Sequence, residues 1–199
     1  MKTSKPFPII HINGYPGAGK RTIARILVGL LDAFEARLVH NHLLIDPAGA
    51  VLPRTSSDYQ ALRRKIREAV FDTLVQSADT MRSMYVFTDY QSSDALGTSV
   101  VAEYESTALR RGCDFIPVIV QCSTPENLRR YVSEERTLLG KVTDVALLSH
   151  FRDNAEVHRF SNHPLQLELD VTNLEPAIAA RLIYEHVLSV CQDLRSAVV

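Results

Sequence analysis

The segment Gly14 to Thr22 constrains the fold of this chain more than any other feature. It lies between an apolar run at 7–12, typical of a β-strand, and residues 20–34, whose apolar side chains recur at helical spacing. Glycines at three of its positions let the backbone curl, so that several N–H groups point into one concavity. The helix that follows adds the positive end of its dipole. The segment therefore predicts a phosphate-binding turn between a strand and a helix.

Apolar runs and helical periodicity alternate along the rest of the sequence, which is typical of a parallel sheet covered by helices. Further strands are expected at 37–39, 84–88, 115–121 and 165–171. Helices are expected at 57–81, 94–111, from 124 onwards, at 144–159 and at 175–194, with a polar loop before residue 57. We therefore predict a single α/β domain over 1–199, with a doubly wound sheet of five parallel strands and helices on both faces.

Charge is balanced, with 22 basic and 23 acidic side chains and a net charge of −1. This balance argues against a nucleic-acid partner or an anionic membrane bound by bulk electrostatics. The apolar run near the N-terminus is too short for a signal peptide or a membrane helix. We expect a cytoplasmic protein with a small-molecule partner, as a monomer or a homodimer.

The string Gly14-Tyr15-Pro16-Gly17-Ala18-Gly19-Lys20-Arg21-Thr22 resembles the Gly-x-Pro-Gly-x-Gly-Lys-Gly-Thr loop of adenylate kinases. In element order, most of the chain is similar to the small P-loop kinases, which include shikimate and gluconate kinases, chloramphenicol phosphotransferase and zeta-type toxins. This resemblance implies a P-loop NTPase-type sheet in the order two-three-one-four-five and a small mobile lid at about 129–142. It also implies ATP and Mg²⁺ as cofactors.

The loop supplies the candidate nucleotide-binding residues. Lys20 brings a mobile charge to the outer phosphates and is also a candidate catalytic residue. The Ser or Thr that usually follows this lysine and holds magnesium is Arg21 here, so Thr22 becomes the candidate for phosphate or metal contact, with the Arg21 side chain expected in solvent. The full set of loop residues is Gly14, Gly17, Ala18, Gly19, Lys20, Arg21 and Thr22. The resemblance adds Arg130, and Thr172 in the loop expected beneath the adenine.

The end of the second predicted strand carries a candidate acceptor site. The stretch Asn41 to Asp46 resembles the Val-Asp-x-Leu-Ile-Asp pattern of chloramphenicol phosphotransferase, with His42 in the place of the catalytic aspartate. Histidine can accept a proton near neutral pH, so we predict His42 as base or acceptor contact and Asp46 as a substrate contact. In the alternative interpretation, His42 is only a polar residue of a strand-end loop.

Two further candidates complete the predicted site. Asp89 ends the third predicted strand, where it could hold magnesium and orient the acceptor, although an aspartate here could also cap the next helix. The resemblance makes Arg136 a catalytic lid arginine, whose charge would stabilise the transferring phosphate. Alternatively, the arginines of this segment pair with its own glutamates on a solvated face.

Together these features predict an ATP-dependent phosphotransferase that acts on a hydroxyl of a metabolite or antibiotic. The sequence lacks the Asn-Lys-x-Asp segment of switch GTPases, and Asp89 is not followed by the glutamate typical of motor ATPases. Two alternatives stay open, namely a nucleoside or nucleotide kinase and a nucleotide-binding regulator or slow ATPase that transfers no phosphoryl group.

Overall fold

The computed structural model of the protein describes residues 5–132, 149, 152–153 and 155–195. Its strands are β1 (Ile9–Asn13), β2 (Arg37–His40), β3 (Tyr85–Asp89), β4 (Phe115–Gln121) and β5 (Leu167–Asp170). Its α-helices are α1 (Lys20–Leu30), α2 (His42–Val51), α3 (Tyr59–Gln76), α4 (Ala95–Arg111), α5 (Thr124–Tyr131), α8 (Pro176–Val190) and α9 (Gln192–Arg195).

The strands form one parallel sheet in the order β2-β3-β1-β4-β5, which confirms the predicted topology. In the register of this sheet, Asn13 at the end of β1 lies level with Asp89 at the end of β3. Because the strands are parallel, their carboxyl ends share one edge, and the loops after β1, β2 and β3 leave the sheet there. This edge brings the Gly14–Thr22 turn, His42 and Asp89 to one side of the sheet.

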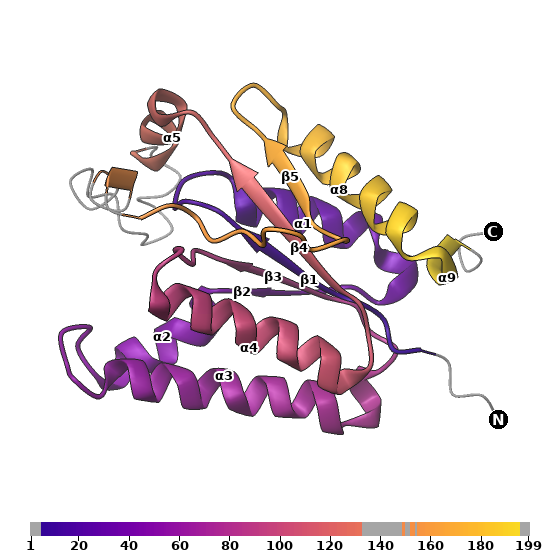
Figure 1. The fold of residues 1–199 in the computed structure, drawn as a ribbon, viewed down its shortest axis with the longest axis horizontal. Helices are drawn as coiled ribbons and strands as arrows, with labels where there is room; N and C mark the ends of the chain where they lie inside the picture. The colour runs from indigo at the N-terminus through magenta and orange to yellow at the C-terminus, as the bar shows by residue number, and fades with distance from the viewer. Residues whose placement is uncertain (1–4, 133–148, 150–151, 154, 196–199) are drawn as a thin grey trace.

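Helices cover both faces of the sheet, as expected for a doubly wound fold (Figure 1). On one face α1 packs against α8, and on the other face α3 packs against both α2 and α4. Each layer has its own apolar core. One core joins α1 and α8 to the sheet and contains Leu27 and Ile183, whereas the other joins α3 and α4 to it and contains Phe71 and Tyr104.

The structure corrects several element boundaries. The segment predicted as a polar loop contains α2, because Leu44 and Ala48, one helical turn apart, are buried although Pro47 and Gly49 disfavour a helix. The first helix ends at Leu30 and is followed by a 3₁₀ turn (Asp32–Phe34). The helix predicted at 144–159 does not extend to its predicted end, since described residues 155–159 are not helical.

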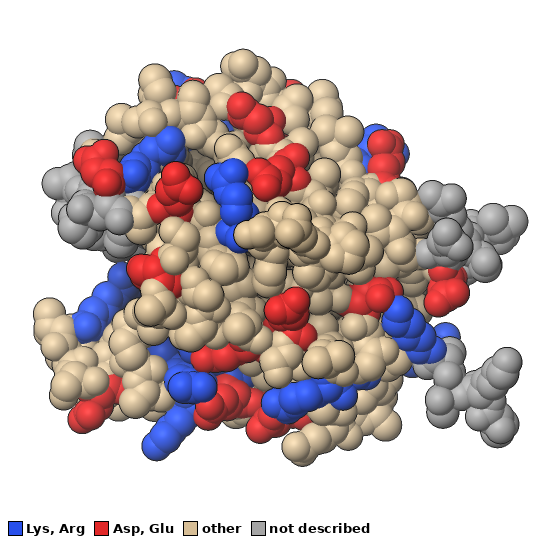
Figure 2. Space-filling model, in the orientation of Figure 1, with Lys and Arg blue, Asp and Glu red and all other residues tan. Residues whose placement is uncertain are grey.

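Acidic and basic side chains are interspersed on the face of the molecule shown in Figure 2. Arg64 with Glu68 and Arg110 with Asp72 form ion pairs on the layer of α3 and α4. Within the described residues, no helix is long and apolar enough to cross a bilayer.

Candidate functional site

At several positions of the turn after β1, the backbone conformation or the space available admits only glycine. Gly14 is buried, and a Cβ atom there would lie 2.4 Å from the carbonyl oxygen of Val120. Gly17 and Gly19 have φ angles of 87° and 88°, in the left-handed region that other residues rarely adopt. Since α1 begins at Lys20, directly after Gly19, the curled loop leads straight into a helix N-terminus. This is the geometry that binds a phosphate.

Lys20 reaches back across this turn. Its ammonium group donates hydrogen bonds to the carbonyl oxygens of Gly14 (2.6 Å) and Tyr15 (2.8 Å). Both acceptors are neutral, and a phosphate oxygen would make a stronger, charge-assisted bond with the same ammonium group. The ammonium is therefore held at the loop and can turn toward a polyphosphate.

Asn13 joins the turn to the neighbouring strand ends. Its side-chain amide donates to the carbonyl oxygens of Gln91 (2.9 Å) and His158 (3.1 Å). Its side-chain oxygen accepts hydrogen bonds from the backbone N–H groups of Gly14 (3.0 Å) and Gln91 (2.8 Å). One buried amide thus fixes the start of the turn relative to the loop after β3 and to the segment around His158.

A second contact holds the turn from the side of α5. The Asn127 side chain is fully buried, and its amide donates to the carbonyl oxygen of Pro16 at 2.9 Å. Its oxygen accepts a hydrogen bond from Arg152 at 2.8 Å, and the Arg152 guanidinium lies 4.5 Å from the centre of the Tyr15 ring. Tyr15 in turn donates to the carbonyl oxygen of Ala155 at 2.9 Å. These contacts preorganise the turn at Tyr15 and Pro16.

We expect Asn127→Ala to lower the free energy of unfolding by about 1–3 kcal/mol, because it removes the donor to the Pro16 carbonyl oxygen and the side-chain acceptor of one Arg152 hydrogen bond. Nucleotide affinity should fall as well, since the turn loses one of its supports. Urea unfolding and calorimetric titration with magnesium-ATP measure the two effects. The exposed Asn162, replaced by alanine, is the matched control. An Asn127→Ala protein with unchanged affinity for the nucleotide would contradict the supporting role.

Asp89 lies at the predicted edge and is only 2% exposed. One oxygen accepts from the Tyr90 N–H at 2.7 Å, and the other accepts from the Gln91 amide at 2.5 Å and the Tyr104 hydroxyl at 3.4 Å. Burial raises the pKa of this carboxyl, although the hydrogen bonds from Gln91 and Tyr90 and the charges of Arg63 and Lys20 oppose the rise. With both oxygens engaged by protein donors, Asp89 fits contact with a metal through a water molecule better than direct ligation.

The position after Lys20 offers no hydroxyl group to a metal ion. Arg21 is half-buried rather than solvated, and its Nε atom is buried without a hydrogen-bond partner among the described residues. Thr22, one position further on, is exposed near the start of α1. In the described part of the chain, no three His, Cys, Asp or Glu side chains are grouped to bind a metal. The donor set thus fits a magnesium ion held mainly by nucleotide phosphates and water.

His42 begins α2 at the carboxyl end of β2, on the predicted edge of the sheet. Its Nδ1 atom lies 3.0 Å from a carboxylate oxygen of Asp46, one helical turn further on. A carboxylate can only accept a hydrogen bond, so Nδ1 carries the proton in this pair and the neutral ring has its lone pair on Nε2. Both side chains are partly or largely exposed. The two predicted acceptor residues are therefore brought together by α2, an element that the sequence did not reveal.

Arg129 and Arg130 share Glu126 as an ion-pair partner, each at 2.6 Å. This agrees with the alternative in which arginines of the segment pair with its own glutamates. Arg130 also donates to the carbonyl oxygens of Val171 and Thr172, both at 3.0 Å, and so connects α5 to the loop between β5 and α8. The Thr172 hydroxyl accepts from the Ser123 N–H at 2.8 Å. Arg136 and the lid positions after Val132 lie outside the described residues.

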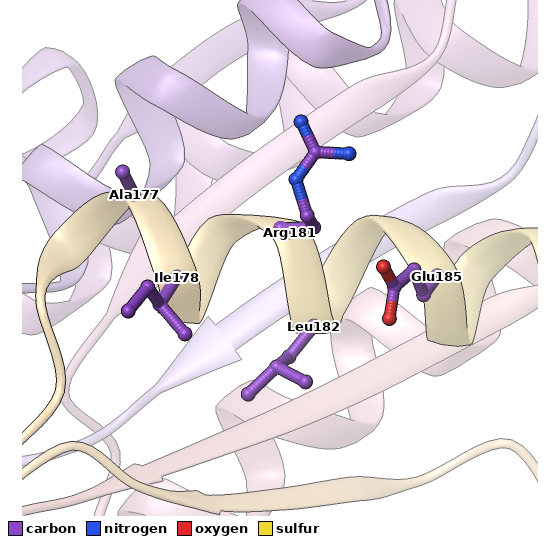
Figure 3. A pocket seen from close by; sticks show the side chains of 5 residues that line it. All are labelled: Ala177, Ile178, Arg181, Leu182 and Glu185. Carbon is purple, nitrogen blue, oxygen red and sulfur yellow. The ribbon is translucent and has the colours of Figure 1, made fainter.

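Hollows on the protein surface occur away from these residues. One of about 220 Å³ lies on α8 and is lined by Ala177, Ile178, Arg181, Leu182 and Glu185 (Figure 3). It is built by a single helix and contains none of the loop residues. Another of about 340 Å³ lies between α3 and α4 and is lined by the ion pairs of that layer.

Sequence reasoning missed the residues that support the turn. Asn13, Asn127 and Arg152 act through contacts with residues that are remote in the sequence, so no local motif marks them. Asn13 had one signal, because it is a polar residue at the end of an apolar strand directly before Gly14.

Comparison with solved structures places the fold. A candidate kinase from Chloroflexus aurantiacus matches with a TM-score of 0.67 and 13% identity, over 94% of this chain and 99% of that one. A gluconokinase from Sinorhizobium meliloti matches with a TM-score of 0.62 and 13% identity, over 97% and 98%. The APS kinase of Mycobacterium tuberculosis, in complex with AMPPNP and APS, matches with a TM-score of 0.61 and 17% identity, over 92% and 98%.

No protein-family model matches the sequence, and a search of curated proteins gave no significant match. The structural matches nevertheless extend over nearly the whole chain and include kinases of several acceptors. The chain therefore has the fold of the small P-loop kinases.

Proposed function

We propose that this protein transfers the γ-phosphoryl group of ATP to a hydroxyl of a small molecule, such as a metabolite or an antibiotic. The observation that carries the proposal is the turn from Gly14 to Thr22, with left-handed glycines, a helix N-terminus and the Lys20 ammonium at one concavity. The fold supports the class of reaction, since its structural matches include a gluconokinase and an APS kinase bound to AMPPNP and APS.

The donor phosphates would be held by the loop amides and by Lys20. Arg130 reaches the same region, because one of its terminal nitrogens lies 3.9 Å from where a Cβ of Gly19 would be. Together with Thr172, it would border the rest of the nucleotide. Magnesium, when bound with ATP, would neutralise phosphate charge. Thr22 would contact the ion, and Asp89 would contact it through a water molecule.

On the acceptor side, the pair of His42 and Asp46 supports a proton-accepting role. Asp46 orients the imidazole ring and leaves the lone pair of Nε2 available to an acceptor hydroxyl. In the transfer, the hydroxyl oxygen forms a bond to the γ-phosphorus as the bond from this phosphorus to the bridging oxygen breaks and ADP leaves. The hydroxyl proton passes to Nε2. Lys20 stabilises the charge that develops on the phosphoryl oxygens.

A screen of hydroxylated metabolites, nucleosides and antibiotics for acceptor-dependent ADP release tests this function. A phosphotransferase is expected to release ADP with a defined acceptor and to yield the phosphorylated product, which mass spectrometry identifies. A nucleoside kinase would respond to nucleosides alone. ADP release that no acceptor stimulates would favour a slow ATPase, an alternative that Arg21 at the usual hydroxyl position supports.

His42→Ala should lower acceptor-dependent turnover about tenfold while nucleotide affinity changes less than about twofold. This loss is smaller than the roughly 10²–10⁴-fold typical of general bases, because a loose phosphoryl-transfer transition state needs little proton removal. Steady-state kinetics and calorimetric titration with magnesium-ATP give the two values. Val51→Ala, at the exposed far end of α2, is the control. Unchanged acceptor-dependent turnover in His42→Ala would remove His42 from the reaction.

A further inference from the structure

The two arginines near the start of α1 differ in their surroundings. Arg25, one helical turn further on, is exposed, whereas Arg21 is half-buried and its Nε atom is covered by protein. Within the part of the chain that the structure describes, Arg21 has neither a hydrogen-bond acceptor nor a carboxylate partner. A guanidinium that loses hydration without gaining a partner costs free energy, and a bound anion would offset this cost.

The direction of α1 brings the Arg21 side chain to the phosphate turn. Cα–Cβ bonds in an α-helix tilt toward its N-terminus, so a side chain of the first turn leans over the residues before it. Directly before Arg21 come Gly19, with a φ of 88°, and Lys20. The Lys20 ammonium group donates to the carbonyl oxygens of Gly14 and Tyr15 within the same turn. Arg21 therefore belongs to the same concavity as Lys20 and can reach a phosphate held there.

Two adjacent cations at this end of α1 oppose the usual electrostatics of a helix. The N-terminus of a helix carries partial positive charge and favours acidic side chains. The first turn of α5 follows this rule with Glu126, but the first turn of α1 contains no acidic residue and begins with Lys20 and Arg21. A polyphosphate would complement both cations and the helix dipole, so this arrangement favours the nucleotide-bound state.

The same region provides few direct ligands for magnesium. In most P-loops a hydroxyl group follows the lysine and binds the ion, but this position is Arg21 here. Thr22 is exposed, and both carboxylate oxygens of Asp89 already accept hydrogen bonds from protein groups. A guanidinium can neutralise phosphate charge without a metal, because it binds two phosphate oxygens with parallel hydrogen bonds.

We propose that Arg21 binds the outer phosphates of the nucleotide directly, so that this protein binds metal-free ATP or ADP nearly as tightly as their magnesium complexes. The inference rests on the proposed function, because it assigns a form of the nucleotide to the same turn. At the binding step, the guanidinium would supply the charge that an ion held by a hydroxyl group supplies in other P-loops.

Calorimetric titration with AMPPNP and with ADP, each in magnesium and in EDTA, tests this role. For wild type we expect dissociation constants that differ less than about fivefold between the two conditions. Arg21→Met should raise the dissociation constant in EDTA about 10- to 100-fold, the loss typical of a charge-assisted hydrogen bond, and should raise it less in magnesium. Arg21→Ser restores the usual hydroxyl group and should bind tightly only in magnesium.

Three further measurements separate binding from folding. Arg25→Met removes an exposed arginine from the same helix and should leave every dissociation constant unchanged. Arg21→Lys keeps the charge without the planar fork and should recover part of the affinity in EDTA. Without nucleotide, Arg21→Met should melt at or above the temperature of wild type, because it removes a cation from a helix N-terminus. Equal changes in magnesium and EDTA in Arg21→Met, or no change in either, overturn the role of Arg21.

Acceptor-dependent ADP release, measured in parallel, separates this inference from the proposed function. Metal-free binding that depends on Arg21, without release stimulated by any acceptor, supports the role of Arg21 and contradicts the transfer reaction. Release that an acceptor stimulates, combined with wild-type binding only in magnesium, supports the transfer and rejects the role of Arg21. A wild-type protein that binds AMPPNP and ADP in neither condition rejects both.

Discussion

Lys20→Ala is expected to lower acceptor-dependent ADP release about 10²- to 10³-fold, the loss typical of removing one preorganised donor from a developing negative charge. In the structure, the ammonium group lies 2.6 and 2.8 Å from two loop carbonyl oxygens, so it is already held at the concavity where the outer phosphates would bind. Replacing the side chain removes a charge that no other residue of the turn supplies at this position. Steady-state kinetics with magnesium-ATP and the acceptor found by screening measures the loss.

Two controls distinguish this loss from damage to the fold. Lys65→Ala removes an exposed lysine on α3 and should leave turnover unchanged. Lys20→Arg keeps a positive charge but places a planar fork where a compact ammonium group fits, so it should restore little activity. A Lys20→Ala protein that melts like wild type and retains more than a tenth of its turnover would show that the turn does not stabilise the transferring group.

The sheet could be predicted from the sequence because its strands are local apolar runs with clear ends. The run at 115–121 coincides with β4, the strand predicted to end at Asp89 does so, and the helix predicted at 94–111 ends at Arg111, directly before Gly112. Gly112 adopts a φ of 74°, which is the conformation that a glycine C-cap provides. The phosphate turn was predictable for the same reason, since all of its essential residues are contiguous.

Elements stabilised by distant contacts could not be predicted in this way. The sequence predicted a polar loop before residue 57, yet burial of Leu44 and Ala48 in the layer of α3 outweighs the low helix propensity of Pro47 and Gly49. Ser57 and Gln60 have the spacing of a capping box, which favours a helix start at residue 57. The helix begins at Tyr59, and neither Ser57 nor Asp58 caps it through a side chain. In both cases tertiary packing, rather than local sequence, sets the boundary.

The residues of the candidate site fall into the same two groups, those marked by local sequence and those positioned by distant contacts. The loop residues and Asp89 lie where a strand-end argument puts them, because parallel strands bring their carboxyl ends to one edge. By contrast, the pairing of His42 with Asp46 depends on α2, and the support of the turn by Asn127 depends on a contact 111 residues apart in sequence. Roles for these residues in catalysis remain predictions that the variants described above can test.

Acidification from pH 6.5 to 4.5 is expected to cost the protein about 2 kcal/mol of unfolding free energy through one buried histidine, His11. His11 lies in the central strand β1 and is 1% exposed, and its ring stacks on Tyr104 with ring centres 4.3 Å apart. Its Nε2 atom is buried without a hydrogen-bond partner among the described residues. Burial above all, with the charges of His158 and Lys20, lowers its pKa from 6.5 to about 3.

The sign of this effect follows from the direction of the shift. Because the folded pKa lies below the unfolded value, the unfolded chain binds more protons than the native protein between about pH 3 and 6.5. Stability is therefore fully present above pH 6.5 and is lost as the pH falls toward 3.

His11→Phe and His11→Leu remove the titrating group and replace it with apolar side chains of different shape. For each variant, urea unfolding measures the loss of unfolding free energy between pH 7 and pH 4.5. Because both values come from the same variant, the effect of its altered packing cancels in the difference. Both should lose about 2–3 kcal/mol less than wild type over this range, and equal losses in all three proteins would assign the acid sensitivity to other groups.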